Sequence, residues 1–262
     1  MREQALLQTV LQGYRRILGH RLAGFYVHGS IAFGCFTWET GDIDFLAVVT
    51  EPLSQGDKEA IIRLLLSLTP DAPPKGFEMS VVLQDCCRSF RHPMPFELHY
   101  SNAHRARAEA DLAAFCREMH GEDPDLAAHV TVVRRVGLAL CGPAPMEMFA
   151  EVPPDCYRDS ILSDVAGAET EIASDPVYLT LNLCRVLAFA QDGAVLSKRQ
   201  GGEWGLAHLP ERYHPLLRAA CASYADGCAF TETACLQPFA GDMLARIRHA
   251  FRLQEAAEHP DA

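Results

Sequence analysis

Two short stretches near the N-terminus decide the fold: Tyr26-Val27-His28-Gly29-Ser30 and Gly41-Asp42-Ile43-Asp44-Phe45-Leu46. The first ends an apolar run over residues 22–28, which is typical of a strand and is broken by the Gly-Ser pair. The second opens another apolar run over residues 42–49, directly after a Thr-Gly turn signal. The sequence therefore predicts two strands, one ending at the Gly-Ser pair and the other beginning at the paired aspartates.

The paired aspartates indicate a metal site. Residues two apart on a strand point to the same face, so Asp42 and Asp44 present two carboxylates side by side. Adjacent carboxylates repel each other unless a cation lies between them, and hard oxygen ligands suit Mg²⁺. The turn at Gly29 and Ser30 leaves backbone N–H groups and a hydroxyl available for phosphate oxygens. Taken alone, the aspartate pair is equally typical of solvated turn carboxylates.

A third carboxylate follows in the right order. A helix is expected over residues 58–68, and the next predicted strand, residues 77–83, carries Glu78 near its start. Neighbouring strands lie about 5 Å apart, so Glu78 could face the aspartate pair. Two uses of this carboxylate remain open, because it could bind a second metal ion or accept the proton of an attacking hydroxyl.

The character of the chain changes near residue 106. Before it, strands and helices alternate, and a short strand is expected over residues 96–100. After it, helical periodicity dominates. We expect an α+β protein in which residues 1–105 form a mixed sheet with flanking helices and residues 106–262 form an all-α bundle. The helices expected there cover residues 108–120, 124–140, 155–173, 176–192, 202–208, 213–227 and 239–257.

Composition excludes several classes of protein. Of the 262 residues, 49% are hydrophobic and 22% charged, which is ordinary for a globular chain, and no apolar run is long enough to span a bilayer. The net charge of −11 argues against a nucleic-acid partner and would attract a small cationic molecule, although solubility alone would also explain it. Ten scattered cysteines without a CxxC pair favour free thiols in a reducing compartment. We expect a cytoplasmic protein with no membrane partner.

The quoted stretches resemble the nucleotidyltransferase superfamily related to DNA polymerase β. The closer similarity is to aminoglycoside adenylyltransferases of the streptomycin/spectinomycin type, and it covers nearly the whole chain. Residues 77–82 are similar to the strand that carries the catalytic glutamate of that family. Residues 181–185, 196–198, 203–204 and 209–213 are similar to its helical C-terminal domain, and these segments are the more specific ones.

The resemblance implies a reaction and a set of roles. ATP and Mg²⁺ are expected, and an adenylyl group would pass to a hydroxyl of a small cationic acceptor with release of pyrophosphate. Asp42 and Asp44 would bind Mg²⁺, Glu78 would be the general base, and Gly29 and Ser30 would hold phosphate. The positions that match ATP contacts of the C-terminal domain are Arg185, Lys198 and Tyr224.

The acceptor is expected in a cleft between the two domains, next to the acidic residues Glu78, Glu97 and Asp175. Asp175 matches an antibiotic-contacting aspartate of the family. Ala103 stands where the family has a tryptophan that helps to hold streptomycin, so we expect spectinomycin rather than streptomycin. Two alternatives stay open: adenylylation of a protein or another metabolite, and a nucleotide-binding module without catalysis, which the three carboxylates argue against. We expect a monomer.

Overall fold

The computed structural model describes residues 2–258, with side chains through residue 254. The chain forms two compact units, residues 1–160 and residues 161–262. All ten cysteines are free thiols. Within the described residues, no helix combines the length and apolar character needed to cross a membrane.

The first unit is built on a five-stranded mixed sheet in the order β5-β3-β2-β1-β7. The parallel pair β2 and β3 is joined through helix α3, whereas the other neighbouring strands are antiparallel. A separate two-stranded sheet pairs β4 with β6. The strands are β1 (Leu22–Val27), β2 (Ile43–Val49), β3 (Phe77–Leu83), β4 (Met94–Phe96), β5 (Leu98–Tyr100), β6 (Gly121–Asp123) and β7 (Leu138–Cys141).

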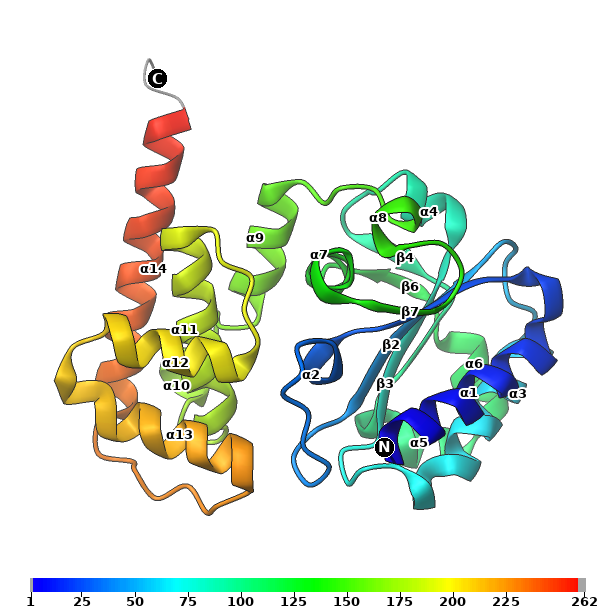
Figure 1. Cartoon of the computed structure of the whole chain (residues 1–262), viewed down its shortest axis with the longest axis horizontal. Coiled ribbons are helices and arrows are strands. Elements are labelled where there is room, and N and C mark those ends of the chain that lie inside the picture. The colour runs from blue at the N-terminus through cyan, green and yellow to red at the C-terminus, as the bar shows by residue number, and fades with distance from the viewer. Residues whose placement is uncertain (1, 259–262) are drawn as a thin grey trace. The chain divides into compact units, whose positions relative to one another are not determined.

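The main core lies between one face of the sheet and four helices, which Figure 1 shows grouped on one side of it. At its centre Tyr14 meets Phe25 and Phe45 edge-on, and the two phenylalanine rings stack at 4.6 Å. Ser54 begins α3 with a capping box, because its hydroxyl accepts the backbone N–H of Asp57. The four helices are α1 (Arg2–Leu18), α3 (Gln55–Leu68), α5 (Arg105–Ala110) and α6 (Leu112–Glu118).

The opposite face of the sheet is polar at one end. Phe45 and Met79 point into the core, so the residues next to them in sequence, Asp44 and Glu78, lie on the other face. Four short helices accompany β1, β2 and β3 in the rest of this unit. They are α2 (Gly29–Ala32), α4 (Gln84–Arg88), α7 (Leu126–Val136) and α8 (Pro145–Met148).

The division of the chain differs from the one expected. The helix predicted over residues 124–140 ends at Val136, and residues 138–141 form strand β7, which pairs with β1. Because β7 is part of the sheet, the first unit cannot end at residue 105. It extends to residue 160. Residues 138–141 are too short a segment for periodicity to separate a strand from a helix end.

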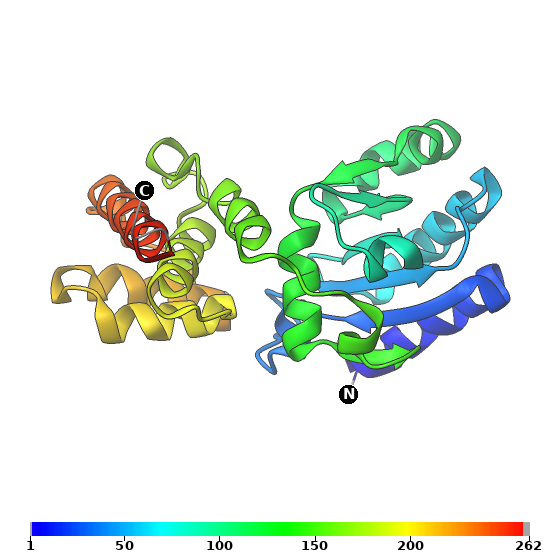
Figure 2. The ribbon, with the colours of Figure 1, turned by 90° about the horizontal axis from the view of Figure 1, so that it is seen from above.

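The second unit is helical, as Figure 2 shows. Helix α11 is its central element and packs against α12, α13 and α14. Gly193 ends α11 in the left-handed conformation with φ of 64°, and Ser197 begins α12 with a capping box. Its helices are α10 (Ala168–Glu171), α11 (Pro176–Asp192), α12 (Lys198–His208), α13 (His214–Asp226) and α14 (Leu236–Glu258), and α9 (Pro154–Ser163) crosses the boundary between the units. The predicted α+β fold class with a helical C-terminal part is confirmed.

Candidate active site

The structure brings three carboxylates together at one end of the sheet. Asp44 on β2 lies directly beside Glu78 on the parallel strand β3, and Asp42 precedes Asp44 by two residues. One oxygen of each carboxylate lies within 4.8 Å of the others. All three donors are oxygens and all three residues are half-buried or buried, which is the donor chemistry that suits Mg²⁺. The residues present therefore fit a magnesium ion.

The Gly-Ser turn packs directly against this cluster. The backbone N–H of His28 donates to the carbonyl oxygen of Asp44 at 3.0 Å. Gly29 follows with φ of 59°, and a Cβ at this position would come within 1.7 Å of Oδ2 of Asp44. Only glycine fits at this position, because the Cβ of any other residue would collide with the Asp44 carboxylate and the positive φ would strain its backbone.

Ser30 carries a buried hydroxyl that makes no hydrogen bond with the described residues. Buried hydroxyls are normally paired, and an unpaired one costs free energy comparable to a lost hydrogen bond. The hydroxyl is therefore suited to a polar group of a bound molecule. A phosphate oxygen is one acceptor that would satisfy it.

A small cavity of about 250 Å³ adjoins the carboxylates. Its wall includes Asp42 and Glu78, together with Ala103, which follows β5 in the chain. The small side chain of Ala103 leaves space here that a large aromatic residue would occupy. The other lining residues are Lys75, Phe77, Ser101 and Asn102.

His129, Asp125 and Ser160 form a polar network that the sequence did not predict. Nε2 of His129 on α7 lies 3.2 Å from Oδ2 of Asp125, and the hydroxyl of Ser160 donates to the other oxygen of Asp125 at 3.0 Å. The rings of His129 and His28 lie 4.8 Å apart. The spacing of Asp125 and His129, four residues apart in a predicted helix, was the one available signal, but such pairs are common on helix surfaces.

The two histidines differ in charge. Burial is the main cause that lowers the pKa of His28, and the neighbouring charge of His129 lowers it further. Burial also lowers the pKa of His129, but the charge and hydrogen bond of Asp125 outweigh this effect. With the negative charges of Glu78 and Asp44 added, the pKa of His129 rises to about 10. At neutral pH, His129 is therefore an imidazolium and His28 is neutral.

Glu97, expected beside the acceptor, lies away from the carboxylate cluster. Its backbone N–H donates to the carbonyl oxygen of Val81, and its carboxylate accepts the backbone N–H of Leu53 at 3.0 Å. Three residues of strand separate Val81 from Glu78, which is about 10 Å. Because β5 is antiparallel to β3, the residue that precedes β5 lies toward the far end of β3. The structure therefore does not bring Glu97 to the carboxylate cluster.

Two of the residues expected to bind ligands in the second unit, Asp175 and Arg185, have structural contacts. Asp175 is exposed and caps α11 by accepting the backbone N–H of Tyr178 at 3.3 Å. Arg185 donates from Nε to the carbonyl oxygen of Leu196 at 2.8 Å and from Nη1 to the side chain of Asn182 at 2.7 Å. The bond to Leu196 ties α11 to the segment that leads into α12.

Lys198 and Tyr224 lie on the two neighbouring helices of this unit. Lys198 is the first residue of α12, and its ammonium lies 4.7 Å from the centroid of the Tyr178 ring, within the range of a cation–π contact. Tyr224 is half-buried on α13, which packs against α11 and α12. The structure therefore places Arg185, Lys198 and Tyr224 on three helices that contact one another.

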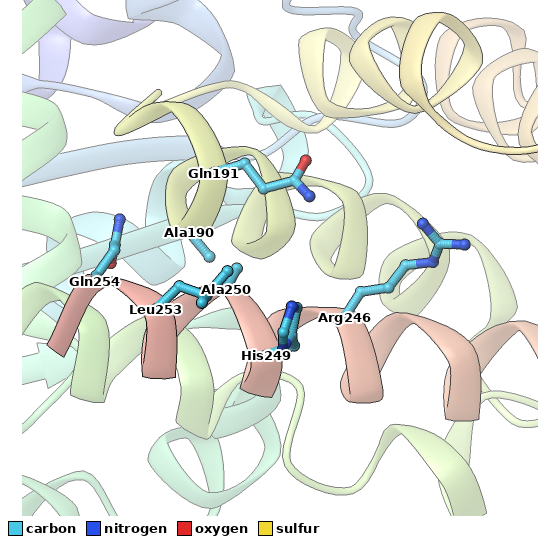
Figure 3. Close-up of a pocket in the computed structure, with 7 residues that line it drawn as sticks. All are labelled: Ala190, Gln191, Arg246, His249, Ala250, Leu253 and Gln254. Carbon is cyan, nitrogen blue, oxygen red and sulfur yellow. The ribbon is translucent and has the colours of Figure 1, made fainter. Parts of the chain in front are cut away.

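A second hollow, of about 440 Å³, lies between α11 and α14 (Figure 3). Figure 3 shows Leu253 and Ala250 on α14 facing Ala190 on α11, with Gln191 and Arg246 at the rim. None of its described lining residues carries a carboxylate. This hollow therefore offers no metal site and none of the acid–base chemistry of the carboxylate cluster.

Residues 147–246 match the family model described as the C-terminal domain of aminoglycoside adenylyltransferase. This part of the chain is therefore similar to that domain. The resemblance to aminoglycoside adenylyltransferases expected from the sequence is thus confirmed, and the match covers the helices that hold Asp175, Arg185, Lys198 and Tyr224.

Known proteins similar to this chain extend the likeness beyond the C-terminal domain. An aminoglycoside (3'') (9) adenylyltransferase of Klebsiella pneumoniae is 28% identical over 224 residues, which are 83% of this chain and 84% of the relative. A spectinomycin 9-adenylyltransferase of Campylobacter jejuni is 22% identical over 84% of this chain and 82% of its own. The crystal structure of the spectinomycin adenyltransferase of Enterococcus faecalis with ATP and spectinomycin has the same fold, with a TM-score of 0.80 and 19% identity over 94% of this chain and 99% of that one.

Proposed function

We propose that this protein transfers the adenylyl group of ATP to a hydroxyl of an aminoglycoside or aminocyclitol antibiotic and releases pyrophosphate. The observation that carries the proposal is the convergence of Asp42, Asp44 and Glu78 beside the Gly29-Ser30 turn. The adenylyltransferase C-terminal domain and the names of the relatives support the choice of reaction.

Asp42 and Asp44 are proposed to hold magnesium, with Glu78 completing the cluster or acting on the acceptor. Magnesium bound there would stabilise the negative charge that develops on the phosphates during transfer. The hydroxyl of Ser30, buried and unpaired within the described residues, would donate to a phosphate oxygen. Gly29 leaves space beside the Asp44 carboxylate that a Cβ at this position would occupy.

In the proposed reaction the acceptor oxygen attacks the α-phosphorus of ATP as the bond to the pyrophosphate oxygen breaks. Glu78 would receive the proton of the attacking hydroxyl, since its carboxylate borders the cavity beside Asp42. Lys198 would neutralise charge on the departing pyrophosphate, and Arg185 and Tyr224 would contact ATP. Asp175 would contact an amine of the acceptor.

Spectinomycin is the acceptor that we favour over streptomycin. The net charge of −11 favours a cationic acceptor, and the cavity beside Glu78 is bordered by Ala103 rather than by a large aromatic side chain. Two relatives similar to this chain carry spectinomycin in their names.

The test is pyrophosphate release by the purified protein with ATP and Mg²⁺, with spectinomycin and streptomycin offered separately. We expect release with spectinomycin, and we expect Glu78→Gln to lower kcat at least about 100-fold. The matched control is Glu97→Gln, which removes a carboxylate that precedes β5 and lies outside the cluster, and keeps an oxygen to accept the N–H of Leu53.

Equal losses in the two variants would contradict the role given to Glu78. If pyrophosphate were released with a protein or another metabolite but with neither antibiotic, the adenylyl transfer would stand and the proposed acceptor would be wrong. No release with any acceptor would refute the proposed reaction.

A further inference from the structure

Arg185 is the only cationic residue of α11, and it lies half-buried among apolar neighbours in the middle of that helix. Its guanidinium donates hydrogen bonds to two uncharged oxygens, and it forms no ion pair with a carboxylate in the described part of the chain. Partly buried charges are normally paired, because removing them from water costs free energy. The positive charge of Arg185 is therefore available to an anion that binds from outside the protein.

The side chain of Arg185 is held in one orientation by three contacts. Nε donates to the carbonyl oxygen of Leu196 at 2.8 Å, and Nη1 donates to Oδ1 of Asn182 at 2.7 Å. The stem packs closely against Gly201 of α12, where a Cβ would lie 2.6 Å from Cγ of Arg185. Because Nε and Nη1 both have partners, the two N–H groups of Nη2 remain for a bound molecule.

The side chain of Asn182 bonds to Arg185 and to no other described residue. It is only 1% exposed, and its Nδ2 makes no hydrogen bond within the described residues. A guanidinium only donates hydrogen bonds, so the amide oxygen faces Arg185 and the amide nitrogen points elsewhere. A buried donor without a partner costs free energy, which an apolar residue of the same shape would avoid. Asn182 therefore orients Arg185 at some cost to the stability of the helix bundle.

We propose that Asn182 is a positioning residue, whose amide oxygen holds the guanidinium of Arg185 in the orientation that binds the phosphates of ATP. This proposal rests on the ATP contact that the proposed function gives to Arg185. It assigns Asn182 no contact with a substrate. A long side chain loses conformational freedom when it binds a ligand, and a contact that orders it beforehand reduces this loss.

The proposal predicts a change in ATP affinity without a loss of stability. Asn182→Leu keeps the branched shape of the side chain and removes its oxygen, so ATP itself must order Arg185. We expect Kd for ATP to rise about three- to tenfold, which corresponds to the ordering of one long side chain. The free protein should melt at the same temperature or higher, because the unpaired Nδ2 is removed as well. Asn182→Ala removes the same oxygen without adding volume and should raise Kd to the same extent.

The experiment measures ATP binding by isothermal titration calorimetry, with Mg²⁺ present and without an acceptor. The matched control is Thr180→Val, which removes a fully buried hydroxyl of the same helix that has no hydrogen bond within the described residues. Its Kd should stay within twofold of that of the unchanged protein. Asn182→Leu is then combined with Arg185→Ala. Because Asn182 acts through Arg185, the double variant should bind ATP as Arg185→Ala does, within twofold.

The outcomes separate failure of this proposal from failure of the proposed function. If the unchanged protein binds no ATP, or if Arg185→Ala binds ATP as tightly as the unchanged protein, the ATP contact of Arg185 fails and this proposal fails with it. If Arg185→Ala weakens binding but the two Asn182 variants do not, only the role of Asn182 is refuted. Equal weakening by Asn182→Leu with and without the Arg185 side chain would also refute it, since the effect would then not pass through Arg185.

Discussion

Replacement of Gly29 by Ala tests how closely the turn and the carboxylate cluster are fitted. The added Cβ would lie 1.7 Å from Oδ2 and 2.5 Å from Cγ of Asp44. Because carbon and oxygen normally stay about 3.3 Å apart, the Asp44 carboxylate must retreat by about 1.5 Å. A misplacement of about 1 Å in a catalytic group costs on the order of 100-fold in rate. We therefore expect kcat for pyrophosphate release to fall about 100-fold or more.

Gly29→Ala also carries a backbone cost, because φ at this position is 59°. A left-handed conformation costs a non-glycine residue about 1–2 kcal/mol. Gly34→Ala separates the two effects, since Gly34 has φ of 70° but nothing within 4 Å of the added carbon. Urea unfolding should give similar losses of stability for both variants, whereas only Gly29→Ala should lose activity. If Gly29→Ala stayed within threefold of Gly34→Ala in kcat, the fit between the turn and Asp44 would be refuted.

Three further predictions concern folding, the second unit and the metal. Asp57→Asn removes the partner of Arg21 and half of a capping box, so we expect unfolding at neutral pH to cost about 2 kcal/mol less than in the unchanged protein. The hydrogen bond from Arg21 is the main cause that holds the pKa of Asp57 well below its usual value. The stability that Asp57 contributes is therefore present above about pH 4 and is lost as the pH falls. Urea unfolding at pH 3 should show a smaller difference in stability between the variant and the unchanged protein. Lys198→Ala should lower kcat about 100-fold, whereas Arg199→Ala, which removes an exposed pair with Glu203, should leave it within twofold in the same assay. Chelation with EDTA should abolish pyrophosphate release and added Mg²⁺ should restore it; release that survives chelation would contradict the metal role.

The local predictions that succeeded rest on short-range patterns. Strand β3 lies at the predicted residues 77–83, and the spacing of Asp42 and Asp44 already indicated a common face. These features depend on the two-residue period of a strand, which can be read along one segment of sequence without knowing which other strands pair with it. The free thiols likewise follow from cysteine spacing.

What the sequence did not predict is which segments lie side by side. The position of Glu97 depends on the direction of β5 relative to β3, and the boundary at residue 160 depends on β7 joining β1. Strand order and direction arise from packing between segments distant in sequence, so no local pattern records them.

The sequence by itself determined that this chain carries strands ending in a Gly-Ser turn and beginning with paired aspartates, followed by a helical C-terminal part. Only the tertiary structure decided that Glu78 lies beside Asp44 in a parallel pair, and that an imidazolium on α7 stands behind them. Periodicity and turn residues act over a few positions and can be read along the chain. Charge balance in a site is a property of groups brought together in space, so it appears only once the chain is folded.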